Sequence, residues 1–336
     1  MDDTADLCEA LVDLGLIKAG EQPRFSFMTG GVSCDVAKVE TADGRVFVIK
    51  KALSQLRVAA EWLASAERSA FEVQWLKLVS ARVSANLVPE VIAELPERHI
   101  FVMAYLPVET HLVWKAELLE GRVDPEFAGA LGRSLVQIHA ATAAVPALAE
   151  QFATDDLFMA LRIDPFLLHV ARSQADVAPT LEALALDLQS RKIALVHGDV
   201  SPKNILVGPK GPVILDAECA VYGDPAFDLA FCLTHLLIKS VFLEDKGELL
   251  IDSTRSLVGA YLSGVRWEDP QDLSRRTAKL VSALLLARLD GKSPAAYLTD
   301  ERDKQLIRHQ AKTFLKDPTL DLAQLIDRWT FEERTE

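Results

Sequence analysis

The residues of this chain best suited to catalysis lie in one short polar segment, residues 195–204, with the sequence LVHGDVSPKN. In this segment Asp199 precedes Asn204 by five positions, and a predicted hairpin follows. A carboxylate at the first position can meet an acceptor hydroxyl, and an amide oxygen at the second can turn toward a metal held on phosphate groups. We therefore predict Asp199 as a catalytic carboxylate and Asn204 as a metal ligand, although this spacing taken alone is common in polar loops.

A pair of carboxylates follows the predicted hairpin. Its strands are expected at residues 205–207 and 213–215, around a turn at residues 208–211, and Asp216 comes directly after the second strand. A strand end is a rigid mount for a carboxylate that binds magnesium on a phosphate chain. Glu218, two residues on, faces the same side if the chain stays extended. We predict both as metal ligands, whereas Asp216 taken alone could be a turn residue.

These segments resemble a known superfamily. The triplet HGD at residues 197–199, Asn204 and the run LDAE at residues 215–218 are similar to motifs of aminoglycoside phosphotransferases and choline kinases. Protein kinases carry HRD and DFG at the corresponding places. The run YGDPAFDLA at residues 222–230 resembles a further motif of the superfamily. The resemblance implies a kinase-like fold and phosphoryl transfer from a nucleotide to a small-molecule hydroxyl, and it gives Asp228 a structural role beside the catalytic loop.

A lysine that grips the nucleotide phosphates is expected at the end of a strand in the first hundred residues. The strand predicted at residues 45–50 ends in Lys50, followed by Lys51. Alternation places Lys50 on one face with Val46 and Val48, which favours it over Lys51. Glu72, on the helix predicted at residues 68–79, is expected to pair with Lys50, with Glu67 as the alternative.

Two further segments are predicted to contact the nucleotide. The turn at residues 29–34, TGGVSC, lies between the first two predicted strands. Its Gly30 and Gly31 allow backbone N–H groups to approach phosphate, and Ser33 belongs to the same turn. Residues 101–107, FVMAYLP, resemble a hinge between lobes, with Met103, Ala104 and Leu106 at the adenine edge.

The pattern of elements predicts an α+β, protein-kinase-like fold with two lobes. Strands are expected at residues 25–28, 36–40, 45–50, 91–93 and 100–103, with helices at 6–17 and 68–79. Beyond Pro107 the pattern is mainly helical, with helices expected at residues 125–143, 155–171, 180–190, 225–239, 249–262 and 274–289. We therefore predict a nucleotide-binding lobe at residues 1–105 and a catalytic and substrate-binding lobe at residues 106–336.

The acceptor is less well defined by the sequence. The run at residues 50–57, KKALSQLR, together with Phe71-Glu72, resembles methylthioribose kinases, and Arg275-Arg276 could correspond to their paired substrate-binding arginines. Two arginines at a helix start are also commonly solvated. Asp224, Trp114 and Arg288 are further candidates for the acceptor site, and Trp114 could equally belong to the core. The acceptor is expected to be a sugar such as methylthioribose, an aminoglycoside or an amino alcohol.

Composition excludes several other classes. A formal net charge of −13 argues against a nucleic-acid or anionic-membrane surface, and the four cysteines show no zinc-site spacing. The acidic start of the chain does not resemble a secretory signal. We expect a cytoplasmic monomer or homodimer that uses ATP, or GTP, with Mg²⁺. A pseudokinase of the same fold is the alternative, whereas the short interval between Asp216 and Asp228 leaves no room for the activation loop of a protein kinase.

Overall fold

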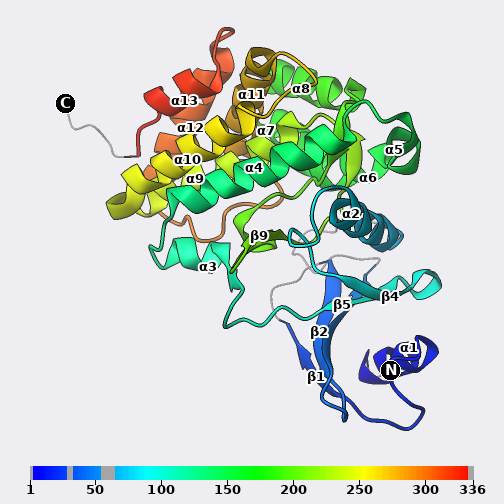
Figure 1. The fold of residues 1–336 in the computed structure, drawn as a ribbon. Coiled ribbons are helices and arrows are strands. Elements are labelled where there is room, and N and C mark those ends of the chain that lie inside the picture. Colours follow the sequence, from blue (N-terminus) through cyan, green and yellow to red (C-terminus); the bar gives the residue numbers. More distant parts are fainter. Residues whose placement is uncertain (1–2, 29–32, 54–64, 332–336) are drawn as a thin grey trace. The chain divides into compact units, whose positions relative to one another are not determined.

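The computed structural model describes residues 3–28, 33–53 and 65–331, which fall into two compact units. The first comprises Met1–Thr110 and Asp216–Glu218, and the second comprises His111–Leu215 and Cys219–Glu336. An antiparallel sheet dominates the first unit and helices dominate the second (Figure 1). The α+β fold class predicted from the sequence is confirmed.

The sheet of the first unit is antiparallel throughout, in the order β1-β2-β3-β5-β4. Its strands are β1 (Arg24–Phe27), β2 (Cys34–Glu40), β3 (Val46–Ala52), β4 (Val91–Leu95) and β5 (Ile100–Ala104). A tight turn joins β2 to β3, where the Thr41 N–H donates to the Arg45 carbonyl at 3.0 Å. Gly44 takes a left-handed backbone in this turn, with φ 84°, which is why the pair Asp43-Gly44 favours a hairpin turn here.

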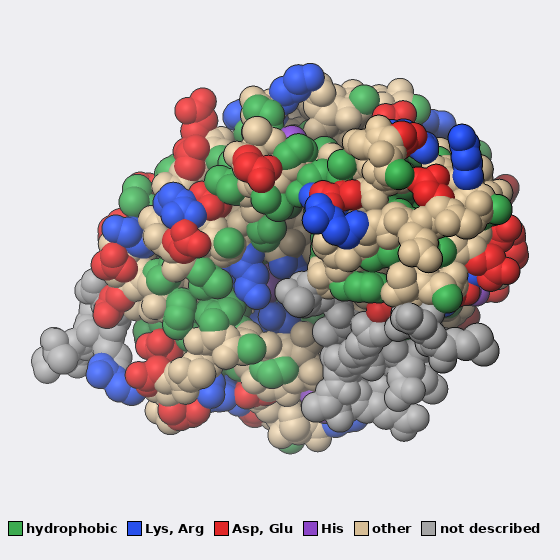
Figure 2. All heavy atoms as spheres, turned by 90° about the horizontal axis from the view of Figure 1, so that it is seen from below, with side chains coloured by type: hydrophobic (Ala, Val, Ile, Leu, Met, Phe, Trp, Pro, Cys, Tyr) green, Lys and Arg blue, Asp and Glu red, His purple; other side chains and the backbone are tan. Residues whose placement is uncertain are grey.

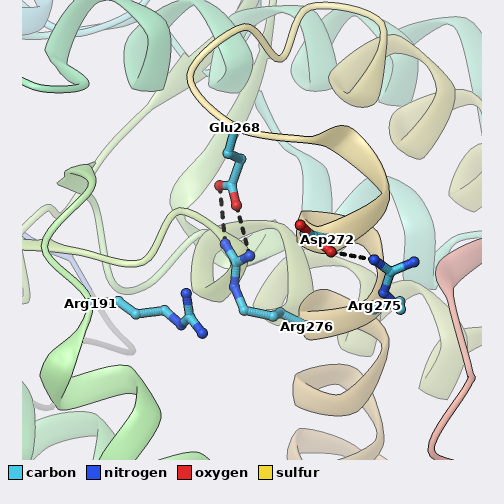
Figure 3. A pocket seen from close by; sticks show the side chains of 5 residues that line it. All are labelled: Arg191, Glu268, Asp272, Arg275 and Arg276. Atoms are coloured by element: carbon cyan, nitrogen blue, oxygen red, sulfur yellow. Dashed lines mark hydrogen bonds and ion pairs between the residues drawn. The ribbon is translucent and has the colours of Figure 1, made fainter.

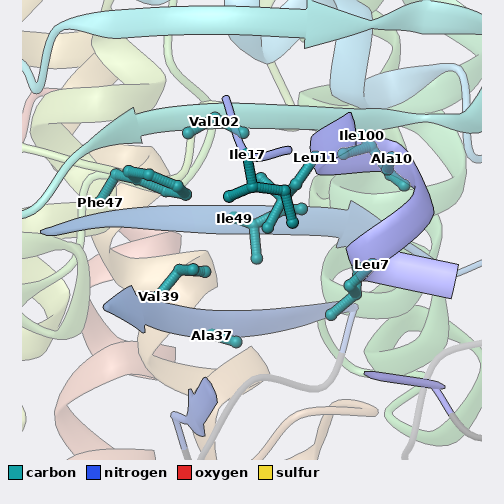
Figure 4. Packing of buried hydrophobic residues seen from close by; sticks show 10 residues of the cluster. All are labelled: Leu7, Ala10, Leu11, Ile17, Ala37, Val39, Phe47, Ile49, Ile100 and Val102. Carbon is teal, nitrogen blue, oxygen red and sulfur yellow. The ribbon is translucent and has the colours of Figure 1, made fainter. Parts of the chain in front are cut away.

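Helix α1 (Asp3–Asp13) covers one face of this sheet. Leu7, Ala10 and Leu11 from the helix pack with apolar side chains from three central strands (Figure 4). The strand residues of this cluster are Ala37, Val39, Phe47, Ile49, Ile100 and Val102. Alternate side chains of β3 therefore point toward α1, and the residues between them point to the other face.

Helix α2 (Arg68–Arg82) contacts strand β3, and the two lysines of that strand distinguish its faces. Lys50 Nζ lies 2.8 Å from Glu72 Oε1 on α2, and Lys51 Nζ lies 2.6 Å from Asp6 Oδ2 on α1. The two neighbouring lysines thus point to opposite faces of one strand, as the period of two requires.

The second unit is built around helix α9 (Ala226–Phe242), of which every residue except Phe242 is buried. A helix that is apolar on all sides must be enclosed by other helices. Helices α10 (Gly247–Leu262) and α11 (Pro270–Asp290) both pack against α9, while α4 (Pro125–Thr142) packs against α10. The remaining longer helices of the unit are α8 (Ala178–Ser190), α12 (Glu301–Lys316) and α13 (Leu322–Arg328).

The structure differs from the sequence-based elements in several places. The helix expected at residues 155–171 is instead α6 (Asp155–Phe158), a π-helix η2 (Met159–Leu168) and α7 (His169–Ser173), with Pro165 inside the π-helix. Proline lacks the N–H that a regular α-helix needs at this point, which accounts for the altered winding. Helices α12 and α13 were not predicted. Strands β6 (Leu112–Val113), β7 (Ala194–Val196) and β10 (Val221–Gly223) were also missed because they are very short.

The surface carries both signs of charge. On the face shown in Figure 2, acidic and basic side chains are scattered among apolar ones. Across the described residues, no single helix is both long and apolar enough to cross a membrane. The helical stretches Ala226–Phe242 and Glu244–Leu262 meet the length and composition test only jointly, and they are bent by 119° at their junction.

Candidate active site

The loop that carries Asp199 is held by hydrogen bonds to the backbone carbonyl of Asp199 itself. The loop runs from β7 to β8 (Ile205–Gly208), and β8 pairs with β9 (Gly211–Ile214) in the predicted hairpin. The Asp199 carbonyl accepts from the Ser201 N–H at 2.8 Å and from the Asn204 Nδ2 at 3.1 Å. Asn204 therefore closes the loop across the five positions that separate it from Asp199.

His197 braces this loop. The Asp199 N–H donates to His197 Nδ1 at 3.0 Å, so that nitrogen is an acceptor. The other ring nitrogen, Nε2, then carries the hydrogen and donates to the Leu215 carbonyl at 3.0 Å. Both nitrogens are occupied by backbone groups, and the arrangement gives His197 a positioning role.

Asp228 anchors the same loop from helix α9. Its two carboxylate oxygens accept from the backbone N–H groups of His197 at 2.7 Å and Gly198 at 2.8 Å, and His139 Nε2 lies 3.2 Å from Oδ2. Gly198 has a φ of 79°, and a Cβ there would lie 2.5 Å from the Cys219 carbonyl oxygen. Only glycine fits at this position.

The side chain of Asp199 faces two cations. Its Oδ2 lies 3.0 Å from Arg162 Nη2 and 3.1 Å from Lys203 Nζ. Both cations attract the carboxylate and hold it in one orientation.

Sequence reasoning did not identify Arg162. Its Nε donates to the Gly198 carbonyl and its Nη1 to the Leu161 carbonyl at 2.7 Å, while its guanidinium lies over the rings of Phe166 and Phe231. Arg162 belongs to the π-helix, a rare winding that in its short form, the π-bulge, is frequent at functional sites. Pro165 inside a predicted helix was the available signal.

In the first unit, Lys50 joins two carboxylates. Its Nζ bonds Glu72 of α2 and also Asp216 Oδ1. Burial alone would lower the pKa of Lys50, but the charges of Asp216 and Glu72 hold that pKa well above its usual value. Burial raises the pKa of Glu72 to about 7. Asp216 has a left-handed backbone, with φ 68°, a strained conformation that aspartate tolerates better than most residues.

A second buried ion pair lies beside this group. Arg68 Nε donates to Glu218 Oε2 at 2.9 Å, and the Cys34 thiol lies 3.6 Å from the same oxygen. The Arg68 guanidinium also donates to the carbonyls of Ser33 and of Leu53, the latter at 2.8 Å. Arg68 therefore links Ser33, just before β2, to Glu218. Sequence reasoning missed this role because arginines at the start of a helix are usually exposed.

The oxygen donors of this unit suit magnesium. Nucleotide enzymes usually bind Mg²⁺ through one or two carboxylates together with substrate phosphates, without an all-protein cage. The described residues contain no group of three or more His, Cys, Asp or Glu side chains that could hold a metal ion. Asp216 offers a partly exposed carboxylate of the required kind, whereas Glu218 is engaged by Arg68.

Only some of the other residues predicted to contact the nucleotide lie within the described part of the chain. Gly30 and Gly31 lie outside the described residues. Ser33 is buried at the start of β2. Met103 and Ala104 end strand β5, where the Ala104 N–H donates to the Glu90 carbonyl at 2.8 Å. Leu106 follows two residues later and is half-buried.

Three of the candidates for the acceptor site lie close together in the second unit. Arg275 and Arg276 line a pocket of about 300 Å³ with Arg191, Glu268 and Asp272 (Figure 3). Arg276 bonds Asp224 through Nε at 2.9 Å and Nη2 at 3.1 Å, and it also bonds Glu268. Arg275 pairs with Asp272 at the surface.

Trp114 lies apart from this group, whereas Asp224 belongs to it through Arg276. Trp114 is 2% exposed and packs edge-on against Phe127, with ring centroids 5.3 Å apart. Asp224 also accepts from the Ala226 N–H at 3.0 Å, at the start of α9. The structure thus gives Trp114 a packing contact, and it engages Asp224 in structural bonds.

Comparison with known proteins gives one family and several relatives. Residues 24–256 match the family model described as "Phosphotransferase enzyme family". A methylthioribose kinase of Pectobacterium carotovorum is 31% identical over 232 residues, which cover 60% of this chain and 56% of that protein. One from Escherichia coli is 26% identical over 225 residues, covering 58% and 52%. The chain thus spans little more than half the length of these relatives.

Solved structures share the fold. An amicoumacin kinase in complex with AMP-PNP, Ca²⁺ and Ami is 15% identical, with a TM-score of 0.57 and 97% of both chains covered. A choline/ethanolamine kinase family protein from Mesorhizobium loti is 16% identical, with a TM-score of 0.53, covering 96% of this chain and 98% of that one. The predicted kinase-like fold is confirmed.

Proposed function

Since the chain belongs to the phosphotransferase enzyme family, we propose that it is a kinase that transfers the γ-phosphate of ATP to a hydroxyl of a small molecule. The observation that carries this proposal is the fixed geometry of Asp199. Its loop is closed by Asn204 and anchored by Asp228, and two cations hold its carboxylate in one place. The acceptors in question are sugars such as methylthioribose, aminoglycosides and amino alcohols, and a cytoplasmic location belongs to the same proposal.

In this proposal the two units contribute different parts of the reaction. Lys50 neutralises the α- and β-phosphates and is itself positioned by Glu72. Magnesium, when bound, would neutralise charge on the transferring phosphate, with Asp216 and Asn204 as its protein ligands. Asp199 orients the acceptor hydroxyl for in-line attack and accepts its proton late. Met103, Ala104 and Leu106 would hold adenine.

Glu218 has a different role in the proposal from the one its spacing predicted. Its carboxylate already compensates the buried charge of Arg68, so binding a metal directly would leave that charge without its counter-ion. We assign it to the support of the phosphate-binding turn, since Arg68 also holds the Ser33 carbonyl.

The test is magnesium-dependent ADP release from ATP over a panel of hydroxylated acceptors. The panel contains methylthioribose and other sugars, aminoglycosides, choline, ethanolamine and homoserine. Asp199→Asn should lower acceptor-stimulated release by about 100-fold or more and leave nucleotide affinity within about twofold. Asp252→Asn, an exposed acid on α10, is the matched control. Near-normal turnover of Asp199→Asn would contradict the catalytic assignment, and failure to bind any nucleotide would contradict the proposed activity.

A further inference from the structure

One face of the buried helix α9 leads away from the catalytic carboxylate. Phe227, Phe231, His235 and Lys239 recur every four residues, a spacing that aligns side chains along one side of a helix. The rings of Phe227 and Phe231 stack with centroids 5.6 Å apart, and those of Phe231 and His235 meet edge-on at 5.4 Å. We call these four side chains the α9 stripe.

Arg162 connects Asp199 to this stripe. Its guanidinium carbon lies 5.6 Å from the centre of the Phe231 ring, and its Nη2 lies 3.0 Å from Asp199 Oδ2. Lys239 follows Phe231 by eight residues, a rise of about 12 Å along the helix axis. Lys239 thus lies at the end of the stripe, about 12 Å along the helix from the ring that Arg162 covers, within the span of a small molecule.

The far end of the stripe has cations without matching anions. Lys239 is 1% exposed, and its Nζ reaches only neutral groups, the Tyr297 hydroxyl at 3.3 Å and the His235 carbonyl at 3.5 Å. Arg288, on the adjacent helix α11, donates Nη1 to the Ser293 hydroxyl at 3.0 Å, while its buried Nε has no hydrogen-bond partner. Within the described part of the chain neither cation forms an ion pair.

Such an arrangement is costly unless a negative charge completes it. A buried ammonium group without a counter-ion loses its hydration and gains no compensating attraction. Burial, together with the charges of Lys115 and Arg288, lowers the pKa of Lys239 to about 7. Burial likewise lowers the pKa of Arg288, although the charges of Tyr297 and Asp199 act in the opposite direction. A bound anion would stabilise the charged forms of both side chains.

We propose that Lys239 and Arg288 bind an anionic group of the acceptor, a carboxylate or a phosphate ester, while the acceptor hydroxyl lies at Asp199. This inference rests on the proposed function and narrows its substrate class. Cationic acceptors such as choline and aminoglycosides would place a positive charge against Arg162, Lys239 or Arg288. An acid that also carries a hydroxyl satisfies both ends of the α9 stripe.

If Lys239 had only a structural role, its replacement would affect the protein differently. If Lys239 contributes only its contact with the Tyr297 ring, whose centre is 4.8 Å from Nζ, then Lys239→Met should destabilise the protein. If Lys239 is kept for an absent anion, methionine removes an uncompensated charge and fills the same space. The free protein should then gain stability while it loses anion binding.

The experiment measures anion binding with the nucleotide site filled. Wild type and variants are titrated with sulfate, phosphate, D-gluconate and the neutral analogue D-glucitol, in saturating Mg²⁺ and AMP-PNP, at constant ionic strength and below the pKa of Lys239. We expect gluconate or a phosphate-type anion to bind the wild type and glucitol not to bind. Affinity should fall at least about tenfold in Lys239→Met and Arg288→Met. Preference for gluconate over phosphate would identify a carboxylate, and the reverse a phosphate ester.

Lys316→Met is the matched control, because Lys316 also lies in the last turn of a helix, α12, but is exposed. It should leave anion affinity unchanged. Absence of anion binding to the wild type, or equal affinity in wild type and Lys239→Met, would overturn the proposal. AMP-PNP binding is measured first. If the nucleotide fails to bind while anion binding still depends on Lys239, the kinase assignment fails and the anion site stands.

Discussion

Replacing Asp228 by asparagine tests how the catalytic loop is held. The carboxylate is 1% exposed and accepts from two consecutive backbone N–H groups, those of His197 at 2.7 Å and Gly198 at 2.8 Å. It also faces His139 Nε2 at 3.2 Å. Asparagine keeps the shape of the side chain but offers only one acceptor oxygen.

The expected cost follows from these contacts. Whichever way the amide is turned, its NH₂ group faces a backbone N–H that can no longer be satisfied. One hydrogen bond to a charged acceptor is lost, about 1.5–3 kcal/mol, and a buried donor is left unpaired, about 1–3 kcal/mol. We expect Asp228→Asn to lower the free energy of unfolding by about 3–5 kcal/mol.

The assay is urea unfolding followed by circular dichroism, together with turnover in the ADP-release assay. Asp272→Asn is the control, because Asp272 lies in the first turn of α11 as Asp228 lies in the first turn of α9, but at the surface. It loses the same favourable charge at a helix start, less than about 1 kcal/mol. Turnover should also fall more than about tenfold in Asp228→Asn, because the Gly198 N–H that Asp228 holds directly precedes Asp199 and helps to set its position. Equal stabilities of the two variants would refute this account of the loop.

Three further outcomes are expected. Lys50→Met leaves two carboxylates without their shared cation and should lower the free energy of unfolding by about 3–5 kcal/mol. Lys51→Met, on the opposite face of the strand, should lower it by less than about 1 kcal/mol. Similar losses for the two variants in urea titrations would contradict the placement of the two lysines on opposite faces. The free energy of unfolding of the wild type, relative to that of Lys239→Met, should rise between pH 7 and 10.5. The reason is that the lysine keeps its proton to about pH 10.5 in the unfolded protein and releases it near pH 7 in the folded protein. A stability difference between the two proteins that does not change with pH would argue against a desolvated lysine. Glu218→Gln should destabilise the protein by about 3–5 kcal/mol, because it leaves the buried charge of Arg68 without its counter-ion. Unchanged stability together with a loss of magnesium dependence would instead identify Glu218 as a metal ligand.

Several local features could be read from the sequence because they depend on neighbours in the chain. Alternation along one strand separates Lys50 from Lys51, and the structure places them on opposite faces. The Asp-Gly pair gave the β2–β3 turn, since glycine accepts the left-handed backbone there. The five-residue spacing of Asp199 and Asn204 appears as a loop closed by a hydrogen bond between them.

The winding of residues 155–171 shows where local reasoning was insufficient. Apolar periodicity predicted one regular helix, although Pro165 lies within it. The chain forms a π-helix there, and this winding carries Arg162 to Asp199. A period of 3.6 residues cannot reveal which face of such a segment meets a distant loop.

The sequence by itself determined the types of residue available for phosphoryl transfer, the strand and helix that carry Lys50 and Glu72, and the loop that carries Asp199. Only the tertiary structure decided which charges meet. Arg68 and Glu218 are 150 positions apart, and no local pattern connects them. Lys239 stands at the end of the helix predicted at residues 225–239, and only its enclosure among other helices removes its water and leaves its charge uncompensated. Local spacing fixes backbone geometry, whereas pairing and desolvation of charges depend on which surfaces the fold brings together.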